Sequence, residues 1–96
     1  MRSDDLLRAN RCEILRLAAA HGACHVRVFG SLARDEADDA SDIDFLVDLE
    51  PGRTLFDLGG LQVALESLLG RRIDVVTEHG LRARIRERVL REAAAL

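Results

Sequence analysis

A helix-length apolar segment lies between two short strand-like runs and limits the folds that this chain can adopt. Ile43–Leu49 reads as a strand with an apolar residue at every second position, and residues 72–77 form a second run rich in β-branched residues. The intervening leucines recur at helical spacing, at Leu55, Leu58, Leu61, Leu65 and Leu68. Because a helical crossover of this length suits parallel pairing, we expect the two strands to lie parallel in one sheet.

The limits of this crossover helix are marked by residues with known end preferences. Pro51-Gly52 predicts a turn after the first run, and Thr54 and Asp57 form a capping-box pattern at the helix start. Gly70 is expected to end the helix.

The remaining segments complete an α/β arrangement. We expect a first helix capped by Ser3 and stopped by Gly22, a strand at His25–Phe29, a short helix from Ser31 to about Asp38, and a last helix whose apolar stripe runs from Leu81 to Leu96. The predicted order is α-β-α-β-α-β-α, a mixed three-stranded sheet with about four helices. Ninety-six residues suffice for one small domain, so 1–96 is predicted to be a single domain.

Composition narrows the partners and the compartment. A net charge of −3 argues against direct nucleic-acid binding, which needs a basic surface. No secretory signal and no membrane-spanning run is visible, so a cytoplasmic location is expected. Cys12 and Cys24 lack metal-ligand spacing, and we expect them to be reduced and partly buried, although one disulfide is conceivable. A core of this size gives a modest stability margin, which favours a homo- or hetero-oligomer.

Three aspartates form the first half of a candidate site. Asp42 and Asp44 are two apart on a predicted strand, so their side chains project to the same side. Adjacent anions repel unless a cation lies between them, and carboxylate oxygens suit Mg²⁺. Asp74 lies in the next apolar run, and if the two strands are neighbours it reaches the same place. Three converging aspartates can organise a two-metal site.

The segment that follows the first predicted strand forms the second half. Gly30 lets the backbone approach a phosphate closely, and the expected helix after it offers free N–H groups. Ser31 adds a hydroxyl donor, and Arg34 lies one turn on. Alone, each of these motifs would favour an ordinary turn. In combination, a phosphate-binding segment beside a metal site predicts phosphoryl or nucleotidyl transfer.

These residues resemble the minimal nucleotidyltransferases of the DNA polymerase β superfamily. That family's signature is Gly-Ser, ten residues, then Asp-x-Asp, with a third Asp on a later strand, and Gly30-Ser31, Asp42-Ile43-Asp44 and Asp74 fit it. The likeness runs from about Val26 to Ala94. One departure is Asp35, where many relatives carry Gly.

The resemblance implies a mechanism and a partner. Asp42, Asp44 and Asp74 would bind two Mg²⁺ ions, with Asp74 helping to deprotonate the acceptor, while Gly30, Ser31 and Arg34 would bind the phosphates of ATP. Relatives of this length are often antitoxins that transfer AMP to a tyrosine of a HEPN ribonuclease toxin and so neutralise it. Two alternatives stay open: an antitoxin that acts by direct binding with a vestigial site, and nucleotidyl transfer to a small molecule.

Two other groups have weaker claims. His21, His25 and His79 are scattered, which favours surface or helix-end roles over metal binding. The arginines of the last predicted helix favour a solvated face paired with Glu87 and Glu92, with a partner-binding or nucleotide-facing surface as the alternative. These arginines are Arg82, Arg84, Arg86, Arg88 and Arg91.

Overall fold

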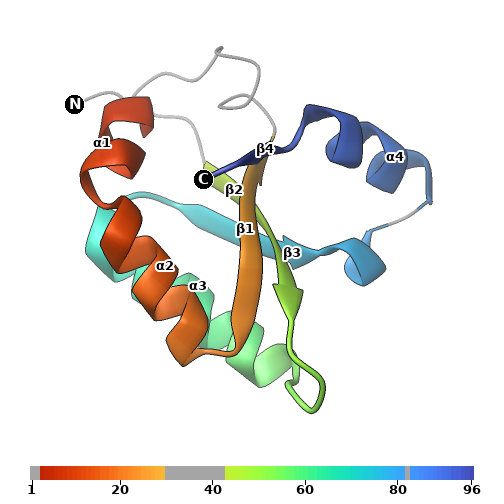
Figure 1. Ribbon diagram of the computed structural model, residues 1–96, viewed down its shortest axis with the longest axis horizontal. Coiled ribbons are helices and arrows are strands. Elements are labelled where there is room, and N and C mark those ends of the chain that lie inside the picture. Colours follow the sequence, from red (N-terminus) through yellow and green to blue (C-terminus); the bar gives the residue numbers. More distant parts are fainter. Residues whose placement is uncertain (1–2, 30–42, 82) are drawn as a thin grey trace.

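The fold was obtained as a computed structural model that describes residues 3–29, 43–81 and 83–96. Within these ranges a four-stranded sheet is flanked by helices (Figure 1). The elements are α1 Ser3–Ala9, α2 Arg11–Ala20, β1 Ala23–Phe29, β2 Ile43–Leu49, α3 Leu55–Leu69, β3 Ile73–Thr77, the 3₁₀ turn η1 Glu78–Gly80, α4 Ala83–Glu92 and β4 Ala94–Ala95.

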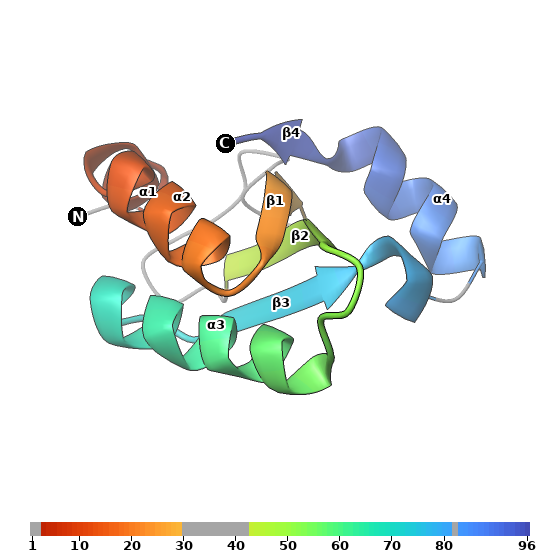
Figure 2. The same cartoon turned by 60° about the horizontal axis from the view of Figure 1, so that its bottom comes forward.

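The sheet has the order β3-β2-β1-β4 and is mixed, as the connection lengths predict. β1 pairs with β2 in antiparallel orientation, and β2 pairs with β3 in parallel orientation, because α3 carries the chain back between them. Figure 2 shows α3 running along the sheet beneath β3. In Figure 1, α4 lies on the other side of β1 and β2 from α2 and α3.

The core lies between the sheet and the helices α1, α2 and α3. Alternate strand residues point into it, among them Ile43 and Phe45 of β2, both 0% exposed. α3 contributes a stripe at helical spacing, Leu61, Leu65 and Leu69. Two further buried residues, Leu46 of β2 and Val89 of α4, lie outside this cluster, so the sheet is also covered on part of its second face.

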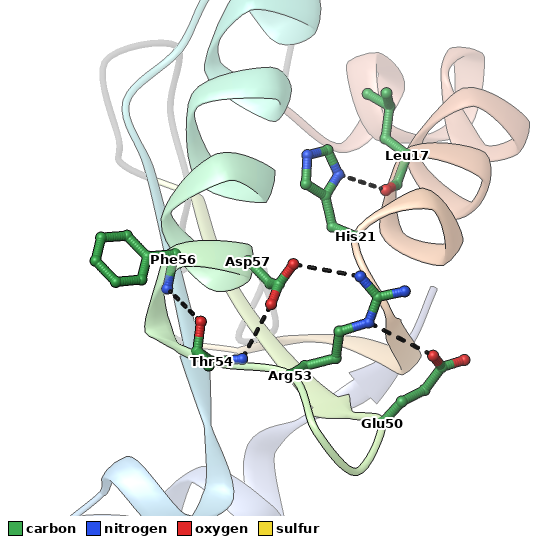
Figure 3. Close-up of polar contacts among 7 residues, drawn as sticks. All are labelled: Leu17, His21, Glu50, Arg53, Thr54, Phe56 and Asp57. Atoms are coloured by element: carbon green, nitrogen blue, oxygen red, sulfur yellow. Dashed lines mark hydrogen bonds and ion pairs between the residues drawn. The ribbon is translucent and has the colours of Figure 1, made fainter.

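The start of α3 confirms the predicted capping box (Figure 3). The Phe56 N–H donates to the Thr54 hydroxyl at 3.2 Å, and the Thr54 N–H donates to the Asp57 carboxylate at 3.0 Å. This backbone hydrogen bond, with help from Arg53, lowers the pKa of Asp57 below its ordinary value. At the other end Gly70 adopts the left-handed conformation, with φ 65°, that the predicted helix stop requires.

The first predicted helix differs from the structure. The single first helix is instead divided at Asn10, whose ψ of 13° departs from helical values. The Asn10 side chain donates to the Leu6 carbonyl at 2.9 Å, and such a local hydrogen bond competes with continuation of the helix.

The predicted three-stranded sheet and the helix up to Leu96 are also wrong. α4 ends at Glu92, and residues 94–95 form a fourth strand on the free edge of β1. The Leu96 N–H donates to the Val26 carbonyl at 3.1 Å, and the Leu96 carbonyl accepts from Arg11 at 3.0 Å. Unpaired backbone groups on the edge of β1 therefore outweigh the helical preference of the alanines.

None of the helices within residues 3–29, 43–81 and 83–96 has the length and apolar character needed to span a bilayer. The helix predicted from Ser31 to about Asp38 lies outside these residues.

Candidate active site

Asp44 and Asp74 lie directly opposite each other on adjacent strands. The parallel register of β2 and β3 pairs Asp44 with Asp74, and neighbouring strands are about 4.8 Å apart. The residues on either side, Ile43, Phe45, Ile73 and Val75, are buried on the core face, so both aspartates point away from the core. The expectation that the two strands are neighbours is confirmed, and the two carboxylates share one face.

The chemistry of this pair fits a divalent cation. Asp44 is half-buried and Asp74 is exposed, so ligands can approach from the solvent side. Two carboxylates at this spacing repel each other, and hard oxygen donors of this kind suit Mg²⁺. No third Asp, Glu, His or Cys joins them among the described residues. The third predicted ligand, Asp42, lies outside those residues, so the complete metal set stays a prediction.

The predicted phosphate-binding segment begins next to this pair. β1 ends at Phe29, whose register partner is Asp44. Gly30, Ser31 and Arg34 follow Phe29 in the sequence and lie outside the described residues. The motif therefore begins one residue after the position that pairs with Asp44, while the contacts of its residues with phosphate stay a prediction.

A β-bulge in β1 decides which side chains share this face. Cys24 pairs with Asp48, but Arg27 pairs with Leu46, so two residues of β1 oppose one of β2. His25 within the bulge has φ 50°, a value that non-glycine residues rarely adopt. The extra residue turns Val26 and Val28 into the core and puts Arg27 and Phe29 on the face of Asp44.

Arg27 and Asp48 are residues of this face that the sequence interpretation did not assign to the site. The Arg27 side chain is only 11% exposed, and its Nη2 donates to Asp48 Oδ1 at 3.1 Å. Asp48 Oδ2 also contacts His25 Nδ1 at 3.1 Å. The sequence places Asp48 in phase with Asp44, but nothing in the alternation of residues 25–29 indicates the bulge that brings Arg27 to Asp48.

The histidines and the cysteines do not build a second site among the described residues. His21 contacts the Leu17 carbonyl at 2.9 Å, a helix-end role in agreement with prediction. Cys12 and Cys24 are free, as expected, but both are exposed instead of partly buried, since each lies on a solvent-facing position of its element.

The last helix carries an exposed ion pair, and a cavity opens at one end of the sheet. In α4, Arg88 pairs with Glu92 at 3.2 Å, in agreement with a solvated face. Arg82 lies outside the described residues. A cavity of about 250 Å³ opens at the carboxyl ends of β2 and β3. Asp48 is one of its lining residues, and four residues of strand, about 13 Å, separate Asp48 from Asp44.

Comparison with known proteins gives one family. The sequence profile of the nucleotidyltransferase domain matches residues 17–96. A protein from Thermococcus cleftensis named protein adenylyltransferase MntA is 39% identical over 89 residues, which cover 93% of this chain and 87% of that protein. A protein from Methanocaldococcus jannaschii, provisionally named a protein adenylyltransferase, is 38% identical over 81 residues, 84% of this chain and 87% of that protein.

Solved structures agree with the fold. A protein provisionally described as a minimal nucleotidyltransferase superposes with a TM-score of 0.86 at 58% identity, covering 96% of this chain and 94% of that chain. A chain from the crystal structure of a toxin–antitoxin with AMP-PNP superposes with a TM-score of 0.76 at 20% identity, covering 90% of this chain and 71% of that chain. The second similarity shows a common fold.

Proposed function

Because the chain belongs to the family of nucleotidyltransferase domains, we propose that it is a Mg²⁺-dependent protein adenylyltransferase. In this proposal it transfers AMP from ATP to a tyrosine of a HEPN ribonuclease toxin and thereby neutralises the toxin. The observation that carries the proposal is the register of Asp44 opposite Asp74, since two adjacent carboxylates on a solvent-facing part of the sheet are the donors that a metal-dependent nucleotidyltransferase needs.

The proposed roles follow from chemistry and position. Asp44 and Asp74, with Asp42, would hold Mg²⁺, which when bound neutralises phosphate charge and polarises the α-phosphorus. Ser31 and the neighbouring backbone N–H groups would bind the β- and γ-phosphates, with Arg34 reaching a phosphate oxygen.

The transfer forms one bond to the α-phosphorus and breaks another. The tyrosine oxygen attacks the α-phosphorus and forms the new oxygen–phosphorus bond, while the bond to the bridging α–β oxygen breaks and releases diphosphate. Asp74 would accept the proton of the tyrosine hydroxyl, which then passes to solvent. Its exposed side chain is accessible to an acceptor on a second protein.

The acceptor is proposed from two kinds of support. Two relatives that this chain matches over most of their length carry the name protein adenylyltransferase. The Gly-Ser and three-aspartate pattern resembles that of antitoxins that modify a HEPN toxin.

A labelled-transfer assay tests the proposal. Wild-type protein incubated with Mg²⁺, α-labelled ATP and a HEPN ribonuclease toxin should give labelled toxin, with a tyrosine as the modified residue. The Asp44→Asn variant should abolish the labelling, and Asp5→Asn, which changes an exposed carboxylate on α1, should leave it unchanged.

The same variants separate the proposal from its alternatives. Toxin neutralisation that survives Asp44→Asn, with no label on the toxin in any reaction, would show inhibition by direct binding and would overturn the enzymatic proposal. Label recovered on a small molecule instead of on the toxin would overturn the acceptor.

A further inference from the structure

Arg27 lies between two carboxylates on the same face of β2. Its register partner is Leu46, and Asp44 and Asp48 lie two residues to either side of Leu46. Both aspartates are therefore diagonal cross-strand neighbours of Arg27, at about 7–8 Å between Cα atoms, a distance that a long side chain can span. The Arg27 guanidinium can reach either carboxylate.

In the structure Arg27 is directed to Asp48. Its Nη2 donates to Asp48 Oδ1 at 3.1 Å, and its Nε donates to the His25 carbonyl at 3.2 Å. The second oxygen of Asp48 contacts His25 Nδ1 at 3.1 Å. The hydrogen bonds of Arg27 to Asp48 and to the His25 carbonyl thus point toward the bulge, away from the row formed by Asp44 and Asp74.

Burial makes the choice of partner energetically important. The Arg27 side chain is 11% exposed, and a buried guanidinium without a carboxylate partner is strongly unfavourable. If Asp48 lost its charge, the carboxylate within reach on the same face of β2 would be Asp44. An ion pair with Asp44 would place a fixed positive charge where a divalent cation has to bind.

We propose that Asp48 is a positioning residue that holds Arg27 away from Asp44 and so preserves Asp44 for the metal and nucleotide. This inference rests on the proposed function, because it assumes that Asp44 binds the metal. The inference also depends on the bulge: in the register of Cys24 with Asp48 continued without an extra residue, Arg27 would point into the core.

Metal binding measured without turnover tests the role of Asp48. The probe is Mn²⁺, followed by electron paramagnetic resonance on the nucleotide-free protein, with circular dichroism to verify folding. We expect Asp48→Asn to weaken Mn²⁺ binding by about tenfold, the size expected for a coupled charge pair. Asp48→Glu keeps the carboxylate and should bind Mn²⁺ within about twofold of wild type.

A double variant separates positioning from a loss of folding or of general negative charge. Arg27→Gln combined with Asp48→Asn removes the competing cation, so Mn²⁺ affinity should return to that of Arg27→Gln alone. As a matched control, Glu50→Gln removes an exposed carboxylate near the end of the same strand and should leave the affinity unchanged.

The outcomes are distinguishable. Wild-type affinity in Asp48→Asn, or a double variant that stays as weak as Asp48→Asn, would overturn the positioning role while leaving the proposed function intact. Mn²⁺ binding that is absent in wild type, or unaffected by Asp44→Asn, would overturn both.

Discussion

Gly22 joins α2 to β1, and its geometry indicates how much stability the fold loses when this glycine is changed to alanine. Its φ is 74°, and its backbone accepts the Glu50 N–H at 2.8 Å and donates to the Ala19 carbonyl at 3.1 Å. A side chain in this conformation costs about 1–2 kcal/mol. A methyl group at Gly22 would also overlap the Arg53 side chain, whose Cδ lies 2.6 Å from the position of the added atom.

Gly52 is the matched control for the backbone term. It has φ 88°, and nothing lies within 4 Å of an added methyl group. We therefore expect Gly52→Ala to destabilise the fold by about 1–2 kcal/mol from backbone strain alone. Gly22→Ala should cost about 1 kcal/mol more, the lower end of the overpacking range, because Arg53 is a flexible side chain that can move.

Equilibrium urea unfolding of both variants measures this difference, provided that the slope of the free energy against urea is unchanged. If Arg53 moves, it loses its contacts with Glu50 and Asp57, which are drawn in Figure 3. In an Arg53→Ala background the two glycine substitutions should cost the same. An excess at Gly22 that persists without the Arg53 side chain, or no excess in wild type, would refute the steric argument.

Two further predictions concern α3. The pKa of Asp57 is lowered in the folded state, so its stabilising effect is present above the ordinary aspartate value of 3.8 and is lost as the pH falls through the lower folded value. Thermal unfolding midpoints should therefore drop on acidification more steeply in wild type than in Asp57→Asn, and parallel curves would contradict this. Leu61 is 0% exposed, so Leu61→Ala should lower the free energy of unfolding by about 2–5 kcal/mol. Val63 is 67% exposed, so Val63→Ala should change this free energy by less than about 0.5 kcal/mol. Urea unfolding measures both free energies, and equal losses in the two variants would contradict the assignment of the Leu61 side of α3 to the core.

The limits of β2 and the start of α3 could be predicted from the sequence because both depend on residues that are close together in the chain. β2 has the predicted limits Ile43–Leu49 because its alternation and the Pro51-Gly52 turn act over a few residues. The capping box at Thr54 is predictable for the same reason. The crossover length predicts parallel strands in one sheet, but the position of Asp74 beside Asp44 depended on those strands being neighbours, which the structure confirms.

The parts that were not predicted depend on contacts distant in sequence. β4 is two residues long and exists through its pairing with Arg27 and Val28, far from it in the chain. The helical spacing of apolar residues up to Leu96 does not indicate that residues 94–95 pair with the edge of β1. The bulge at His25 likewise arises from pairing with β2, so the orientation of Arg27 is outside the reach of local periodicity.

The bulge is a local strain that the rest of β1 compensates. Holding His25 in the left-handed region costs about 1–2 kcal/mol. In return Val26 and Val28, 7% and 8% exposed, face the core, and burying each valine contributes about 1.5–3 kcal/mol. The uninterrupted register would instead turn Arg27 into the core, where a guanidinium costs several kcal/mol unless a carboxylate accompanies it. Hydrophobic burial alone is therefore enough to select the bulge, and the placement of Arg27 beside Asp48 on the face of Asp44 is a consequence of how the core packs.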